Sequence, residues 1–255
     1  MKAVILAGGK GTRISEESQF KPKPMVDIGG MPIIWHIMKT YEAFGINDFI
    51  ICSGHLGYVI KEYFANYFLH MSDITFDLRE NTIQVHKKRA ESWKVTVVDT
   101  GLDTMTGGRL KRIESYIGNE TFLMTYGDGL SNVDISATIE LHKSQNREAT
   151  LVAVQQPGRF GAIEIHNNTV HNFKEKPTGE GSWINGGFFV LEPSVFKLVK
   201  DDSCIWEREP LENLSKSNQL NAFKHDGFWQ PMDTLRDKLA LENLWSSNSA
   251  PWKKW

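Results

Sequence analysis

Short apolar runs alternate along the first 70 residues with longer segments in which apolar residues recur every three or four positions. Residues 3–7 and 48–53 form apolar runs of the length that is typical of buried strands. Residues 32–44 and 58–68 have helical spacing, and the first of these segments begins with proline and is followed by glycine. The order strand, helix, strand, helix predicts a parallel sheet with helices on its faces.

The second half of the chain is predicted to contribute more strands than helices. A buried strand at 121–126 ends at Gly127-Asp128-Gly129, and a helix at 135–143 and a strand at 149–154 follow it. Further strands are expected at 74–78, 82–86, 95–98, 162–166, 170–174 and 187–191, and further helices at 109–116, 194–199, 210–217 and 235–244. Since no repeat or low-complexity linker divides the chain, we expect one α/β domain over residues 1–255. Its sheet should be Rossmann-like, mixed and mostly parallel, flanked by helices, with β-rich additions in the second half.

Composition narrows the class of protein. The 255 residues carry 29 Lys and Arg against 31 Asp and Glu, a net charge of −2, whereas general nucleic-acid binders usually have a basic excess. Cys52 and Cys204 lie outside any metal-binding spacing, so reduced thiols are expected. No signal peptide is visible, and no apolar run approaches the roughly 18 residues of a membrane span. We therefore expect a cytoplasmic protein without nucleic-acid or membrane partners, in which His36 and most tryptophans are structural.

A glycine loop follows the first predicted strand in the opening stretch MKAVILAGGKGTRISEESQFKPKPM. The loop does not match a Walker A motif, because Gly11 follows Gly9-Lys10 where that motif requires Ser or Thr. It does not match the dinucleotide fingerprint either, because Ile14 stands where the third glycine belongs. Glycines allow backbone N–H groups to approach a polyphosphate closely. We therefore interpret residues 8–13 as a phosphate-binding loop of another kind.

Hydroxyl and cationic side chains accompany this loop. Thr12 adds a hydroxyl donor, and Arg13 offers a planar fork that suits phosphate oxygens. Lys21 and Lys23 alternate with prolines, which keep the segment extended and present the ammonium groups at a low entropic cost. A solvated basic turn would explain these lysines if they stood alone. Their position about ten residues after the glycine loop favours phosphate binding.

Several motifs together resemble the sugar-phosphate nucleotidyltransferases, a family that joins a nucleoside triphosphate to a sugar 1-phosphate and releases diphosphate. The motifs are LAGGKGTR, PKPM and GGMPII near the N-terminus, GDG at 127–129, FKEKP at 173–177, NGGFFV at 185–190 and FWQPMDTLRD at 228–237. The resemblance covers nearly the whole chain. Lys10 departs from the pattern, since relatives often carry an apolar or small residue there, but its expected place on the outer side of the loop leaves activity intact.

Within that family, the stretches at 57–73, 105–112 and 228–238 resemble members that use CTP and glucose 1-phosphate. The resemblance implies a Mg²⁺-assisted in-line attack of α-D-glucose 1-phosphate on the α-phosphorus of CTP, which gives CDP-glucose and diphosphate. No covalent nucleophile is required, and the anomeric configuration is retained. The resemblance also implies a homo-oligomer and a role at the entry to CDP-activated deoxysugars for cell-surface polysaccharides such as the lipopolysaccharide O-antigen.

The resemblance further implies roles for particular residues. The catalytic residues are expected to be Arg13, Lys23 and Asp128, and Mg²⁺ is expected to bind Asp128 and Asp233. Asp233 precedes a predicted helix, so a helix N-cap is its alternative role. The nucleotide is expected to contact Leu6, Ala7, Gly8, Gly9, Lys10, Gly11, Thr12, Arg13, Lys23, Thr104, Arg109 and Asp128. The sugar phosphate is expected to contact Glu175, Lys176, Asn185 and Gly186. Residues 1–130 would thus serve mainly the nucleotide, and residues 131–255 mainly the sugar phosphate and assembly.

Three alternatives remain at this point. A thymidylyl- or uridylyltransferase of the same family differs in a few hydrogen bonds to the base, which sequence periodicity does not reveal. A glycosyltransferase that consumes a nucleotide sugar more often carries a D-x-D pair, whereas residues 127–129 are GDG. A regulatory protein that binds sugar nucleotides without turnover is disfavoured by the full set of cations and carboxylates.

Overall fold

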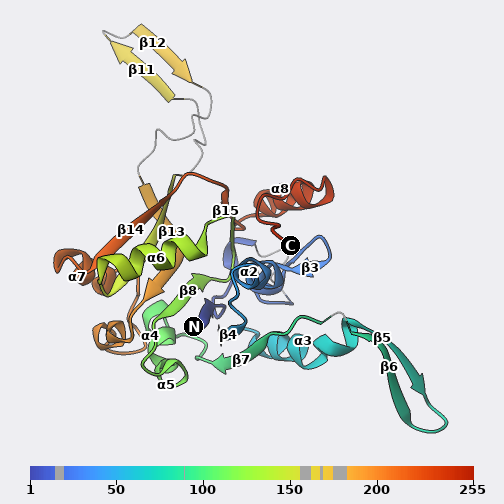
Figure 1. Ribbon diagram of the computed structural model, residues 1–255. Coiled ribbons are helices and arrows are strands. Elements are labelled where there is room, and N and C mark those ends of the chain that lie inside the picture. The colour runs from blue at the N-terminus through green and yellow to red at the C-terminus, as the bar shows by residue number, and fades with distance from the viewer. Residues whose placement is uncertain (15–19, 89, 156–161, 167–168, 175–182) are drawn as a thin grey trace.

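A seven-stranded sheet forms the centre of the computed structural model, which describes residues 1–14, 20–88, 90–155, 162–166, 169–174 and 183–255 (Figure 1). Its strands are β1 (Ala3–Leu6), β4 (Asp48–Ser53), β7 (Lys94–Asp99), β8 (Phe122–Tyr126), β10 (Ala149–Gln155), β13 (Trp183–Leu191) and β14 (Leu220–His225). The strand order across the sheet is β14-β10-β13-β8-β1-β4-β7. All neighbouring strands are parallel except β13, which is antiparallel to both β8 and β10.

Four antiparallel two-stranded pairs accompany the sheet. They are β2 (Asp27–Ile28) with β3 (Met31–Pro32), β5 (Ser72–Asp77) with β6 (Thr82–Lys88), β9 (Gly129–Ser131) with β15 (Trp229–Pro231), and β11 (Ala162–His166) with β12 (Thr169–Lys174). The helices are α2 (Ile33–Glu42), α3 (Gly57–His70), α4 (Thr106–Arg112), α5 (Glu114–Ile117), α6 (Ile135–Gln145), α7 (Glu209–Lys216) and α8 (Leu235–Ser246). Three 3-10 turns complete the list: η1 (Thr12–Ile14), η2 (Lys23–Met25) and η3 (Pro193–Leu198).

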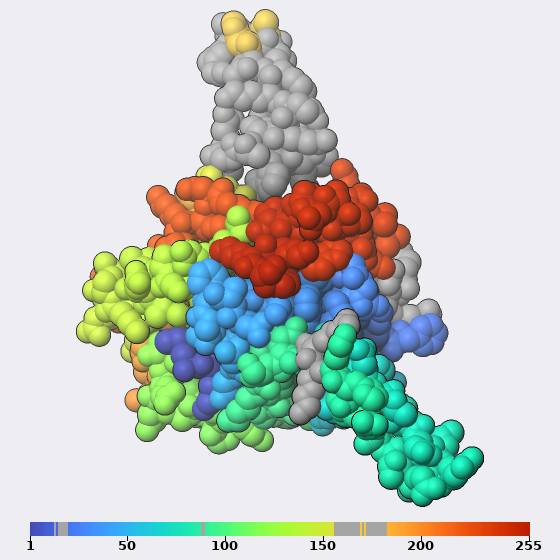
Figure 2. Space-filling model, turned by 45° about the vertical axis from the view of Figure 1, so that its right-hand side comes forward, coloured from blue at the N-terminus to red at the C-terminus, as the bar shows by residue number. Residues whose placement is uncertain are grey.

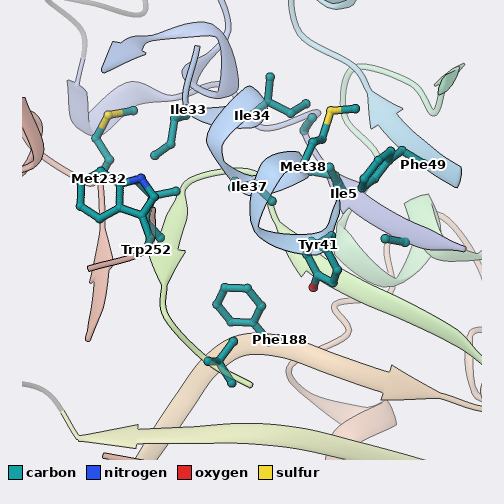
Figure 3. Close-up of a cluster of buried hydrophobic side chains, with 14 of the residues drawn as sticks. Ile5, Ile33, Ile34, Ile37, Met38, Tyr41, Phe49, Phe188, Met232 and Trp252 are labelled. Atoms are coloured by element: carbon teal, nitrogen blue, oxygen red, sulfur yellow. The ribbon is translucent and has the colours of Figure 1, made fainter. Parts of the chain in front are cut away.

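Helices cover both faces of the sheet, and the central strands are therefore apolar on both sides. In β1, Ala3 and Ile5 belong to one buried cluster, whereas Val4 and Leu6 belong to another on the opposite face. This arrangement explains why β1 is a continuous apolar run rather than an alternating one. Figure 3 shows the first cluster, in which side chains of α2 such as Ile37 and Tyr41 lie between the sheet and the C-terminal segment.

The predicted α/β class and most predicted elements are confirmed, and the differences have local causes. The helix expected at 109–116 begins earlier, at Thr106, and divides at Ile113 into α4 and α5. The helix expected at 194–199 is the 3-10 turn η3. The pairs β2–β3 and β9–β15 and the strand β14 were not predicted. The first two consist of strands only two or three residues long, which is too short for periodicity to indicate.

Two hairpins, β5–β6 and β11–β12, extend away from the central sheet (Figure 1). The β5–β6 hairpin forms a separate arm on the molecular surface (Figure 2). The arm carries large exposed apolar side chains, including Phe76, Leu78 and Ile83. None of the described helices is long and apolar enough to pass through a bilayer. Both cysteines have free thiols, as expected, although Cys52 is buried and Cys204 only partly so.

The C-terminal segment packs against α2 through His36, and the space-filling view shows this red segment lying on blue N-terminal residues (Figure 2). The indole N–H of Trp252 can only donate, and it lies 3.4 Å from His36 Nδ1, which must therefore accept. The proton consequently sits on Nε2, which donates to the Ile28 carbonyl at 2.8 Å. Burial among the rings of Trp35, Trp245 and Trp252 lowers the pKa of His36 to about 4. The expected structural role of His36 is thus confirmed.

Because the pKa of His36 is lower in the folded protein than in the unfolded chain, the unfolded state binds more protons at mildly acidic pH. The stability that neutral His36 contributes is complete above its ordinary pKa of 6.5 and is lost as the pH falls toward 4. In His36→Gln, we expect the free energy of unfolding to decrease less on acidification than in the wild type, by up to roughly 3 kcal/mol. Urea unfolding at a series of pH values measures this free energy. His70→Gln, at an exposed histidine, should keep the wild-type pH slope, and an equal slope in all three proteins would contradict the assignment.

Candidate active site

The carboxyl ends of β1 and β8 form the base of the main cavity. The two strands are adjacent and parallel, so the loops that follow them leave the sheet at the same edge, where open α/β sheets bind their ligands. The N–H of Gly127 donates to the Leu6 carbonyl at 3.0 Å and joins the two loops. The cavity has a volume of about 530 Å³ and is lined by the glycine loop, residues 104–109, the ends of β8 and β13, and residues 229–233.

Lys23 lies between two carboxylates in this cavity. Its Nζ is 2.6 Å from Asp128 Oδ2 and 2.7 Å from Asp233 Oδ1, although the three residues are far apart in sequence. Pro22, in an extended conformation, leads into η2, and the Lys23 residue is only 8% exposed. The Met232 N–H donates to the Asp128 carbonyl at 2.8 Å next to the β9–β15 pair, which sets Asp233 beside Asp128. The sequence-predicted catalytic lysine and metal ligands are therefore neighbours.

The alternative role of Asp233 as a helix cap is not what the structure shows. Thr234 caps α8, in a capping box with Asp237. The Asp237 carboxylate also accepts the Asp233 N–H at 3.1 Å and so fixes the backbone from which the Asp233 side chain extends toward Lys23. The Asp233 carboxylate consequently lies in the cavity lining, where it accepts from Lys23.

The two carboxylates suit an oxygen-preferring divalent cation. Asp128 Oδ2 and Asp233 Oδ1 converge on one point, now taken by the Lys23 ammonium. Among the described residues there is no group of three or more His, Cys, Asp or Glu side chains that could form a complete protein cage for a metal. A pair of carboxylates completed by substrate phosphates and water is the usual arrangement for Mg²⁺. The donor set therefore fits Mg²⁺ bound together with a polyphosphate.

The glycine loop leaves room for a ligand on one side and is closely packed on the other. A Cβ added to Gly9 would meet no atom within 4 Å, whereas one added to Gly8 would lie 2.1 Å from Arg109 Nη1. Gly11 has a φ of 65°, which favours glycine. Lys10 points outward and pairs with Asp103 at 2.8 Å, and this hydrogen bond lowers the pKa of Asp103. The ion pair joins the glycine loop to the loop before α4.

Arg13 and Thr12 lie in η1, directly after the glycine loop. Only the backbone of Arg13 is described, so its proposed contact with phosphate stays a prediction. Glu175 and Lys176, which the sequence assigns to the sugar phosphate, lie outside the described residues. The structure does bring Asn185 and Gly186 into the cavity, at the start of β13. Gly186 is held there because the Trp229 indole N–H donates to its carbonyl at 2.7 Å.

Arg109 is buried and binds backbone oxygens of three loops. One terminal nitrogen, Nη1, donates to the Gly101 carbonyl at 2.7 Å, the Thr100 hydroxyl at 2.8 Å and the Ser53 carbonyl at 3.2 Å. The other, Nη2, donates to the Gly8 carbonyl at 3.0 Å. Burial lowers the pKa of Arg109, and the residue is only 5% exposed. Arg109 therefore fixes the position of the glycine loop, and Thr104, also buried, lies beside it at the cavity wall.

Sequence reasoning missed several cavity residues, and three of them have large polar or aromatic side chains. Tyr126 ends β8, Glu207 precedes α7, and Trp229 belongs to β15. Trp229 was noticed within the FWQP stretch but was expected only to pack. Glu207 stands in a short irregular segment between η3 and α7, so neither periodicity nor a motif indicates its position.

Fold and site together are those of a nucleotidyl transferase: the model of that family matches residues 2–230, and the chain belongs to it. The glucose-1-phosphate cytidylyltransferases of Salmonella typhimurium and Salmonella typhi are each 62% identical to this chain over 256 residues, which cover 100% of both sequences. The solved structure of HddC from Yersinia pseudotuberculosis complexed with GMP-PN shares 24% identity and has the same fold. Its TM-score is 0.69, with 96% of this chain and 99% of that one covered.

The buried position of Arg109 generates a stability prediction. Arg109→Met removes the side-chain donor to the Gly101 carbonyl and one of the donors to each of the Gly8 and Ser53 carbonyls. Because these hydrogen bonds come from a buried charged group, we expect a loss of roughly 3 kcal/mol in the free energy of unfolding. Arg112→Met is the matched control on the same helix, because Arg112 is exposed and pairs with Asp202 at the surface. Urea unfolding of both variants measures the difference. Equal losses in both variants would show that the Arg109 hydrogen bonds do not stabilise the loops.

Proposed function

We propose that this protein is a glucose-1-phosphate cytidylyltransferase, which converts CTP and α-D-glucose 1-phosphate into CDP-glucose and diphosphate. The observation that carries the proposal is the group formed by Lys23, Asp128 and Asp233 beside an open glycine loop. Such a group suits two phosphate-bearing substrates that must approach each other. The choice of CTP and glucose 1-phosphate is supported by the full-length similarity to proteins that bear this name.

The chemical difficulty of this reaction is electrostatic, because an anionic sugar phosphate must attack the α-phosphorus of an anionic triphosphate. Catalysis therefore depends on alignment and on positive charge placed where negative charge develops. Backbone N–H groups of residues 8–11 and the Arg13 side chain would hold the triphosphate. Asp128 and Asp233 would hold Mg²⁺, which neutralises phosphate oxygens when bound. No side chain needs to act as a base, because the attacking phosphate oxygen is already ionised near neutral pH.

Lys23 has a second role in this proposal. In the described structure its ammonium neutralises two carboxylates that would otherwise repel each other. If Mg²⁺ were bound by Asp128 and Asp233, the Lys23 ammonium would lie beside the substrate phosphates, where its charge would stabilise them. The Lys23 side chain reaches into the cavity from the buried turn η2.

The same proposal assigns the halves of the chain and the setting of the enzyme. Residues 1–130 contribute mainly to nucleotide binding, and residues 131–255 mainly to sugar-phosphate binding and assembly. We propose a cytoplasmic enzyme that acts as a homo-oligomer and supplies CDP-glucose for deoxysugar synthesis. The exposed apolar side chains of the β5–β6 arm support self-association, because large exposed apolar patches commonly mark interaction surfaces.

The substrates are tested by incubating the protein with glucose 1-phosphate, Mg²⁺ and each of CTP, dTTP, UTP, ATP and GTP in turn, while diphosphate release is measured. We expect CTP to give the highest rate, and we expect addition of EDTA to abolish it. Reaction with dTTP or UTP alone would support a thymidylyl- or uridylyltransferase instead. Consumption of a nucleotide sugar with no diphosphate formed would support a glycosyltransferase.

Lys23 offers a sharper test, because Lys21 is a matched control two residues away. Lys21 pairs with Asp27 at 2.7 Å and lies outside the cavity lining. We expect Lys23→Ala and Asp128→Ala each to lower kcat by roughly 10²-fold or more, since each removes a charge from the reacting centre. Lys21→Ala should retain nearly wild-type turnover, and circular dichroism should show all three variants folded. Near wild-type turnover in the first two variants would remove the roles proposed for these residues.

A further inference from the structure

Glu207 is a third carboxylate in the cavity, in addition to Asp128 and Asp233, which pair with Lys23. The residue lies between η3 and α7 and lines the cavity beside Tyr126 and Asn185. It is exposed, and no described cation forms an ion pair with it. Its carboxylate instead accepts hydrogen bonds from two neutral hydroxyl groups, those of Tyr126 and Thr106.

The hydrogen bonds fix the orientation of this carboxylate. The Trp206 N–H donates to Thr106 Oγ1 at 2.9 Å, so the Thr106 hydroxyl directs its own proton to Glu207 Oε2, 2.6 Å away. The Tyr126 hydroxyl donates to Glu207 Oε1. Burial, together with the charge of Glu207, raises the pKa of Tyr126, which therefore remains a donor. One lone pair of each carboxylate oxygen is used by these donors, and the remaining lone pairs are available to a ligand.

The charge of Glu207 decides which part of a substrate it accepts. A carboxylate repels phosphate groups, so it suits uncharged hydrogen-bond donors. The substrates of the proposed reaction offer two sources of such donors, the hydroxyl groups of the hexose and the exocyclic amino group of the base. Tyr126 and Asn185 line the same cavity, and Asn185 Oδ1 accepts the Gly187 N–H at 2.9 Å at the start of β13. Glu207 is thus held beside Tyr126 at the end of β8, in the cavity that Asn185 and Gly186 of β13 also line.

We propose that Glu207 binds hydroxyl groups of the hexose and contributes to the choice of sugar. This inference rests on the proposed function, since it names the residue that accepts from the sugar of that reaction. Thr106 and Tyr126 act as positioning residues, because they orient the carboxylate through hydrogen bonds. The arrangement resembles carbohydrate recognition in general, where an ionised carboxylate accepts from hydroxyls more strongly than a neutral acceptor does.

The test separates this inference from the proposed function. Wild-type protein is first assayed with CTP and glucose 1-phosphate, and absence of turnover there refutes the function itself. In an active enzyme, we expect Glu207→Ala to raise the KM for glucose 1-phosphate roughly 10- to 100-fold, which corresponds to a lost hydrogen bond to a charged group, with the KM for CTP little changed. Glu209→Gln, at an exposed residue that pairs with Lys200, is the control and should leave both constants unchanged.

Deoxy analogues of glucose 1-phosphate, each lacking one hydroxyl, supply the decisive measurement. Wild-type enzyme should discriminate against the analogue that lacks the contacted hydroxyl, and Glu207→Ala should treat that analogue and glucose 1-phosphate alike. A merely structural role would lower turnover for all analogues equally and would overturn the proposal. A raised KM for CTP, with weaker discrimination against UTP, would instead assign Glu207 to the amino group of the base and would also overturn it.

Discussion

One ammonium group between two carboxylates holds the centre of this site together. Asp128 and Asp233 would repel each other at this separation, and Lys23 removes that cost by donating to both. The three side chains come from η2, the end of β8 and the segment after β15, so the contact joins the two halves of the chain. A ligand that displaces the Lys23 ammonium from between the two carboxylates must bring positive charge of its own. The metal ion of a metal-bound triphosphate would supply that charge.

The sheet topology makes this contact possible, and Arg109 holds the neighbouring glycine loop in place. Adjacent parallel strands β1 and β8 send the glycine loop and the GDG segment to the same edge. Loops that leave a sheet lose their ladder partners, and buried carbonyl groups without donors destabilise a fold. The guanidinium of Arg109 supplies those donors to Gly8, Ser53 and Gly101. A cation that the sequence suggested for nucleotide binding is therefore part of the scaffold beneath the glycine loop.

The sequence was sufficient for the parts of this architecture that leave a local pattern. Apolar runs such as β1 and β8 are buried on both faces of the sheet. A residue that follows such a strand is expected at the edge of the sheet where ligands bind, and Asp128 is such a residue. Other parts depend on contacts between distant residues. The β9–β15 pair has strands of three residues, too short for periodicity, yet it places Asp233. Glu207 reaches the cavity because residues 202–204 hydrogen-bond the start of α4, and no local pattern encodes this.

Charge is unevenly distributed across the cavity, and this unevenness has a consequence for substrate orientation. The backbone N–H groups of the glycine loop favour phosphates, and Lys23 would add to this when a metal ion pairs with Asp128 and Asp233, whereas the Glu207 carboxylate disfavours phosphates beside it. A sugar phosphate that entered with its phosphate toward Glu207 would meet repulsion there and would leave its hydroxyl groups beside Lys23. The productive orientation satisfies both ends at once. The Glu207 carboxylate would therefore contribute less to the total affinity for the sugar phosphate than to its orientation. It would favour the orientation in which the phosphate of the sugar faces the α-phosphorus.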